Sequence, residues 1–195
     1  PDRINRALPD DIRVRAVSEV TSDFDARFSA LWRRYSYTVS DDPRGPDPLR
    51  RRYQLAAGAS LDIDAMNHAA TALVGEHDFT SYCKRKVHAS SVREILSLRW
   101  DREVDLATGF STAVMHVTAD AFCHSMVRSL AGALIPVGQH RVPIDYPRQA
   151  LDLRAREAGV TVMPPYPLVL EEVGYPPESE WAQRQRRTRS LRVTG

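Results

Sequence analysis

The sequence predicts an α+β fold, in which helices pack on one face of an antiparallel or mixed sheet. Three observations predict this class. Segments with helical and with strand periodicity are interspersed along the chain, and the strands come in consecutive pairs. The 195 residues, of which 43% are hydrophobic and 27% charged, are enough to bury one good core or two small ones.

Alternating apolar and polar residues mark the first predicted strands. Within Asp11–Val20, Ile12, Val14 and Ala16 alternate with Arg13 and Arg15, which is typical of a half-buried strand. Arg33–Ser40 predicts a second strand, with Tyr35 and Tyr37 on one face and Arg34 on the other.

The next segment predicts loops around a short strand and a helix. Asp41–Pro48 contains three prolines and a glycine and predicts a loop, which Arg51–Ala57 follows as a short strand. A helix is expected to begin after Asp62, a suitable N-cap residue, and to end at Gly75. The polar segment Glu76–Ser91 predicts an exposed loop.

The second half of the chain predicts a strand pair, two helices and a last strand. Val92–Trp100 and Gly109–Thr118 are the two long strands. Ala121–Gly138 predicts a buried helix, and Pro147–Ala158 predicts another helix with proline in its first turn. Leu168–Val173 is the last predicted strand.

The predicted helix Ala121–Gly138 is apolar nearly all round and carries one charge, Arg128. At about 3.6 residues per turn, His124 and Arg128 share one face of it. A buried arginine normally requires a paired anion, so a carboxylate or phosphate should face Arg128. Two interpretations are open: a structural pair with a carboxylate of the same domain, or an arginine that orients a catalytic acid.

The basic residues are concentrated at the C-terminal end. The formal net charge is +2, but the segment from Glu178 onward holds five arginines and two glutamates, which leaves the rest of the chain near −1. Any attraction to nucleic acid must therefore come from a local patch or from this tail. The tail beyond Pro176 is poor in core residues, so we expect it to be disordered.

Cysteine content and hydropathy bear on the compartment. Cys83 and Cys123 are too few for a disulfide framework and fit a reducing cytoplasm, although a lone disulfide between them stays open. No apolar run approaches about 20 residues, so no membrane-spanning helix is expected. The first residues lack the apolar stretch of a signal peptide and resemble the middle of a longer protein.

Five segments together resemble the TruA family of tRNA pseudouridine synthases. They are INRALPDDIRV (Ile4–Val14), FDARFSALWRRYSY (Phe24–Tyr37), HDFTSY (His77–Tyr82), AFCHSMVRSLAGALIPVG (Ala121–Gly138) and AREAGVTVMPPYPLVLEEVGYP (Ala155–Pro176). Their order and spacing follow the family. The most specific parts are the ARFSA and RRYSY pair and the F-x-H-x-M-V-R core.

The resemblance implies the C-terminal half of a pseudouridine synthase-like fold, in which two similar halves meet at a positively charged cleft. Residues 1–23 would be a remnant and linker from an N-terminal half, 24–176 the C-terminal domain, and 177–195 a basic tail. The implied activity is the isomerisation of uridine to pseudouridine at positions 38–40 of the anticodon stem-loop of tRNA. The family works without metal or cofactor, as a cytoplasmic homodimer.

The resemblance also assigns catalytic residues. The nucleophilic aspartate of the family lies in a G-R-T-D-x-G-V-H motif of the N-terminal half, and this chain contains no such motif. Arg128 matches the arginine that pairs with that aspartate. Tyr35 matches the tyrosine that packs against the flipped uridine and helps to remove the proton from its reacting carbon. The chain alone is therefore expected to be inactive.

Further residues near these motifs are expected to contact the substrate. Basic side chains interleaved with aromatic rings suit contacts with phosphates and bases. The expected contacts are Arg27, Phe28, Arg33, Arg34, Phe122 and His124. For His124, the alternative of a satisfied core histidine is the favoured one.

Residue types in the sequence also suggest two other classes of function. His77, Cys83, His88, Cys123 and His124 are of metal-ligating or nucleophilic types, but their spacing matches no zinc motif. Adjacent helical residues point about 100° apart, which disfavours a dyad within the adjacent cysteine–histidine pair. The second alternative is a non-catalytic domain that binds RNA and dimerises.

Overall fold

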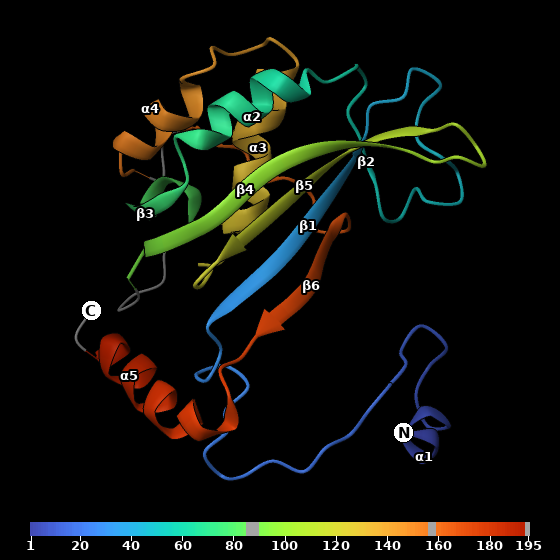
Figure 1. The fold of residues 1–195 in the computed structure, drawn as a ribbon. Coiled ribbons are helices and arrows are strands. Elements are labelled where there is room, and N and C mark those ends of the chain that lie inside the picture. The colour runs from blue at the N-terminus through green and yellow to red at the C-terminus, as the bar shows by residue number, and fades with distance from the viewer. Residues whose placement is uncertain (85–89, 156–158, 194–195) are drawn as a thin grey trace.

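The strands of the chain form one mixed sheet, and helices lie on one of its faces (Figure 1). The computed structural model describes residues 1–84, 90–155 and 159–193. Within these ranges the sheet has six strands, namely β1 (Trp32–Ser40), β2 (Leu55–Ala56), β3 (Gly75–Asp78), β4 (Val92–Val104), β5 (Ser111–Ala119) and β6 (Leu168–Gly174). The predicted α+β class with a mixed sheet is confirmed.

β1 connects the two parts of the sheet. On one side it pairs antiparallel with β5, and β4 and β3 continue the sheet from there to the edge. On its other side, the first part of β1 pairs antiparallel with β6, whereas its last two residues pair parallel with the short β2. Antiparallel pairing therefore dominates, and among the described strands only the short contact between β1 and β2 is parallel.

The helices that cover the sheet are α2 (Ile63–Thr71), α3 (Met126–Gly138) and α4 (Tyr146–Asp152). Asp62 caps α2 as predicted, because its carboxylate accepts a hydrogen bond of 2.9 Å from the backbone of Ala65. Two further helices, α1 (Asp2–Asn5) and α5 (Trp181–Val193), lie away from this layer. None of the described helices combines the length and the hydropathy that a bilayer crossing needs.

The core lies between the sheet and its helical layer. On β1, Tyr37 and Val39 are fully buried toward the helices, while Arg34 is exposed on the opposite face. Every residue of α3 is buried except Arg128 and Pro136. The predicted faces of β1 and the predicted burial of this helix are confirmed.

The strand predicted over Asp11–Val20 is wrong. This segment has no strand partner, and Ile12 and Val17 are 48% and 62% exposed. Alternation produces a strand only where a neighbouring backbone can pair with it, and none of the described strands does so. Instead the side chain of Asn5 bonds both backbone groups of Val14, at 2.7 and 2.9 Å.

The predicted end of α2 and the loop after it also differ. α2 ends at Thr71, and Gly75, with φ +100°, begins β3 instead of closing the helix. All of β3 except Gly75 lies in the segment Glu76–Ser91 that was expected to be a loop, because pairing with β4 overrides its polar composition. Arg85, Lys86 and His88 of that segment lie outside the described residues.

The predicted helix Ala121–Gly138 begins only at Met126. Ser125 has φ +71°, and this left-handed residue separates α3 from a loop that holds residues 121–125. The last predicted helix is shorter as well, since α4 ends at Asp152 and residues 156–158 lie outside the described ranges.

The tail predicted to be disordered contains a 3₁₀ turn, η2 (Glu178–Glu180), and the helix α5. The ring of Trp181 packs on Phe24, with 4.8 Å between centroids. Arg184 donates to the backbone oxygen of Ala30 at 3.0 and 3.1 Å. Because these contacts reach residues far away in sequence, the expectation of disorder is wrong for this part of the tail.

Candidate active site

Arg128 lies in the first turn of α3 and is the only charged side chain of that helix. It is half-buried, and its Nε donates to the backbone oxygen of Met163. Within the ranges that the structure describes, no carboxylate lies within ion-pair distance of Arg128. A guanidinium has five N–H donors, so most of the donors of Arg128 remain available to an anion.

The segment with Met163 and Pro164 holds Arg128 and Tyr37 together. The carbonyl of Met163 accepts from Arg128, and the carbonyl of Pro164 accepts from the hydroxyl of Tyr37 at 2.9 Å. Burial raises the pKa of Tyr37, Tyr166 raises it further, and Arg128 lowers it. Tyr37 is therefore a neutral hydrogen-bond donor at neutral pH. Its bond to Pro164 holds β1 against the segment that also binds Arg128.

Gly132 allows this segment to approach α3. A Cβ at Gly132 would overlap the carbonyl oxygen of Thr161. The same close approach lets the backbone nitrogen of Met163 donate to the carbonyl of Arg128, at 3.3 Å. A glycine one turn beyond Arg128 is thus what holds the extended segment against the arginine.

Tyr35 and Phe122 form the aromatic part of the site. Tyr35 lies two residues before Tyr37 on the same face of β1, on the side of the sheet that carries α3. Its ring meets Phe122 edge-on, with 5.1 Å between centroids and 85° between planes. Tyr35 is half-buried, and its hydroxyl makes no hydrogen bond to any residue that the structure describes. The ring and the hydroxyl are available to a ligand.

A basic segment with one aromatic ring precedes β1. The guanidinium of Arg27 lies 5.6 Å from the ring centroid of Phe28. Arg33 shares the face of Tyr35 and donates to the backbone oxygens of Arg27, at 3.0 Å, and Asp120, at 3.4 Å. Arg33 therefore ties this segment to the end of β5, beside the aromatic pair.

Two predicted contact residues lie elsewhere. Arg34 points to the opposite face of the sheet, where it pairs with Glu172 at 2.7 Å. His124 precedes α3 instead of sharing a helical face with Arg128, because the left-handed Ser125 interrupts the periodicity. The side chain of His124 is exposed, so the expectation of a core histidine is wrong.

Cys83 and Cys123 form a disulfide, with 5.6 Å between their Cα atoms. The bond joins the residue after η1 (Thr80–Tyr82) to the loop before α3. A hydrogen bond of 2.8 Å from the backbone of Lys84 to the carbonyl of His124 accompanies it. The disulfide that the sequence left open is thus present, and it pins the loop that carries the aromatic residue of the site.

The disulfide bears on the alternative of metal or thiol chemistry, because that alternative needs free cysteines. A disulfide sulfur is neither a thiolate nucleophile nor a thiolate ligand, which removes Cys83 and Cys123 in this state. Across residues 1–84, 90–155 and 159–193, no three His, Cys, Asp or Glu side chains are placed to hold a metal ion. His88 lies outside these ranges.

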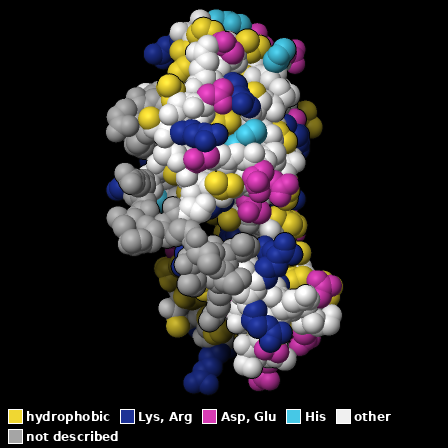
Figure 2. Space-filling view, turned by 90° about the vertical axis from the view of Figure 1, so that its left-hand side faces the viewer, with side chains coloured by type: hydrophobic (Ala, Val, Ile, Leu, Met, Phe, Trp, Pro, Cys, Tyr) yellow, Lys and Arg dark blue, Asp and Glu magenta, His cyan; other side chains and the backbone are white. Residues whose placement is uncertain are grey.

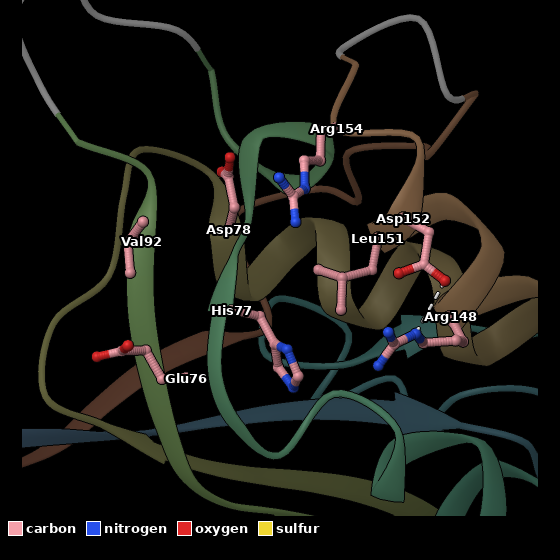
Figure 3. Close-up of a pocket in the computed structure, with 8 residues that line it drawn as sticks. All are labelled: Glu76, His77, Asp78, Val92, Arg148, Leu151, Asp152 and Arg154. Carbon is pink, nitrogen blue, oxygen red and sulfur yellow. Dashed lines mark hydrogen bonds and ion pairs between the residues drawn. The ribbon is translucent and has the colours of Figure 1, made fainter.

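A pocket of about 330 Å³ lies between β3 and α4 (Figure 3). Its lining residues are Glu76, His77, Asp78, Val92, Arg148, Leu151, Asp152 and Arg154. Arg148 pairs with Asp152 at 2.9 Å, and Asp78 faces Arg154. Burial raises the pKa of Asp78, but hydrogen bonds from Ser91 and Thr80 outweigh it, so that the pKa lies below its ordinary value. Arg148 and Asp152 neutralise each other in this pocket, and its lining contains none of the residues around Arg128.

The sequence-based prediction missed the backbone carbonyls that hold the site. Met163 and Pro164 act through main-chain atoms, which no residue type reveals, although the MPPYP sequence indicates an extended segment. It also missed Trp181, whose place in a polar tail was the available signal for a docking contact.

The fold and these contacts define a candidate site on the helix-covered face of a mixed sheet: a half-buried arginine that donates to a backbone carbonyl, and an aromatic pair near the start of β1. The sequence pattern described as tRNA pseudouridine synthase matches residues 69–176 of this chain. The chain belongs to the tRNA pseudouridine synthase family, as the resemblance predicted.

Relatives match the chain nearly from end to end. The tRNA pseudouridine synthase A of Streptomyces griseus is 47% identical over 191 residues, which cover 98% of this chain and 66% of that protein. The protein of the same name from Streptomyces avermitilis is 48% identical, over 98% of this chain and 65% of that protein. The protein of the same name from Mycobacterium leprae is 43% identical, over 97% of this chain and 64% of that protein. The chain thus spans about two thirds of the length of these relatives.

Proposed function

We propose that this chain is the C-terminal part of an enzyme that isomerises uridine to pseudouridine in the anticodon stem-loop of tRNA. The observation that carries the proposal is the state of Arg128. It is half-buried in an apolar helix, it donates only to a carbonyl, and it has no carboxylate partner among the described residues. The names of the relatives support tRNA as the substrate.

In the proposed mechanism Arg128 orients a catalytic aspartate that this chain does not contain. The planar guanidinium binds that carboxylate through two parallel N–H bonds, which keep it ionised and aimed at the ribose. Tyr35 stacks against a uracil that has left the helical stack, and its hydroxyl helps to remove the proton from the reacting carbon.

The surrounding residues are proposed to guide the RNA. Arg27, Phe28, Arg33 and Phe122 are the residues near Tyr35 that would contact the RNA. Residues 24–176 would form the catalytic half and residues 1–23 the linker to the other half. We further propose that the protein acts in the cytoplasm as a homodimer, without metal or cofactor.

The alternative is a domain that binds RNA and dimerises without catalysis. It is favoured for this chain in isolation, because no G-R-T-D motif is present. Both statements hold together if activity needs the longer protein that carries the missing aspartate.

Tritium release from tRNA labelled at C5 of uridine tests the proposal. The longer protein should release tritium, and the 195-residue chain at the same concentration should stay at background. Turnover by the short chain would assign the chemistry to an acid within it, such as Asp78 or Asp120, and would overturn the role of Arg128. Absence of release from every tRNA by the longer protein would overturn the activity itself.

A further inference from the structure

The helix α5 is strongly basic and has no apolar face. It contains five arginines and no aspartate or glutamate between Trp181 and Val193. Its apolar residues do not gather on one side, so packing along its length does not stabilise it. Like charges at neighbouring positions of a helix repel each other, and an external anion relieves such repulsion.

The contacts of α5 are concentrated in its first turns. Trp181 packs on Phe24 and donates to the carbonyl of Pro176 at 3.0 Å. Arg184 donates twice to the carbonyl of Ala30. Phe24 also packs on Tyr175, 5.0 Å away, so an aromatic cluster anchors the start of the helix.

These contacts bind α5 to the segment that leads into the candidate site. Tyr175 donates to the carbonyl of Ala26 at 2.9 Å, directly before Arg27 and Phe28. α5 therefore lies near the start of β1, the end of the sheet where Arg33 and the aromatic pair are found (Figure 1).

We infer that α5 binds the phosphate backbone of the RNA substrate, as a basic arm anchored beside the residues that receive the target nucleotide. The inference rests on the proposed function, since tRNA is the RNA in question. Arginine matches phosphate geometry through its planar fork. The remaining chain is near neutral, and the face shown in Figure 2 mixes basic and acidic side chains. α5 carries a net positive charge, whereas the charges of the remaining chain nearly cancel.

Salt-dependent binding of tRNA by the 195-residue chain tests the inference. The test variant is Arg186→Gln, which keeps Trp181 and places a good helix former at the substituted position. The matched control is Arg51→Gln, an exposed residue in the connection between β1 and β2. Each phosphate contact contributes roughly 0.7–0.9 to the slope of log affinity against log salt. The test variant should flatten the slope by roughly 0.7–0.9, while the control leaves it unchanged.

Every remaining outcome of the experiment would overturn either the role of α5 or the proposed substrate. Equal slopes in the test variant and the unaltered chain, or equal losses in both variants, would overturn the role of α5 and leave the proposed function standing. Loss of binding to anionic phosphatidylserine vesicles but not to tRNA would assign α5 to a lipid surface instead. If the unaltered chain binds no tRNA even at low salt, the proposed substrate fails as well. Thermal melts of all variants confirm that folding is retained.

Discussion

Reduction of the disulfide between Cys83 and Cys123 should destabilise the chain by about 4 kcal/mol. The two cysteines are 40 residues apart, and the chain-entropy relation for a closed loop of that length gives about 4 kcal/mol at 25 °C. For a chain of 150–250 residues, 1 kcal/mol corresponds to roughly 2–4 °C in melting temperature, so reduction should lower it by roughly 8–16 °C. Reduction leaves both side chains in place, so no cavity contributes to this value.

Thermal unfolding followed by circular dichroism, with and without a phosphine reductant, measures the effect. The control is Cys83→Ala with Cys123→Ala, whose melting temperature should not respond to the reductant. A thiol count in denaturant establishes whether the purified chain carries the bond. Two free thiols under non-reducing conditions would refute the bond, and an unchanged melting temperature on reduction of a proven bond would refute the entropy argument. Because disulfides are rare in the reducing cytoplasm, the same thiol count on protein quenched in cells tests the proposed compartment.

Three substitutions test the site. In the longer protein, Arg128→Lys keeps the positive charge but loses the planar guanidinium that binds a carboxylate through two hydrogen bonds. Turnover should therefore fall by about two orders of magnitude or more, with little change in tRNA affinity. If the variant fails to fold instead, Arg128 belongs to a structural ion pair. Tyr35→Phe keeps the ring, and turnover should fall by about 10²–10⁴-fold if the hydroxyl moves a proton; unchanged turnover would rule that role out. Gly132→Ala should cost about 1–3 kcal/mol in urea unfolding, because its Cβ meets the carbonyl of Thr161; unchanged stability would contradict the described packing.

The sheet was largely predictable because burial of one sheet face makes apolar residues recur at every second position of a strand. The tyrosines of β1 alternate with polar residues, and the structure buries the face that carries Tyr37. The same rule failed for Asp11–Val20, since periodicity reports a face that can be buried and not whether a partner strand is present. The prediction for β3 was wrong in the opposite sense, since a loop was expected. These four residues have a polar composition but form a strand because β4 lies beside them.

The candidate site divides along a similar line. Arg128 could be singled out because a charge in an apolar helix needs an explanation, and the structure leaves its anion partner unaccounted for within the described residues. The neighbours of Arg128 could not be derived, because Met163 and Pro164 act through carbonyl oxygens that every residue possesses. Met163 and Pro164 can approach α3 because Gly132 has no side chain at the point of contact.

The position of Arg128 follows from these backbone contacts. A guanidinium whose acceptors were all side chains of the same domain would be neutralised and closed to a ligand. The carbonyl of Met163 holds the Nε edge without cancelling the charge, so the terminal nitrogens keep both their positive charge and their donors. A half-buried arginine in this state costs stability until an anion arrives. We therefore propose that a carboxylate or phosphate, which the described residues do not supply, binds Arg128.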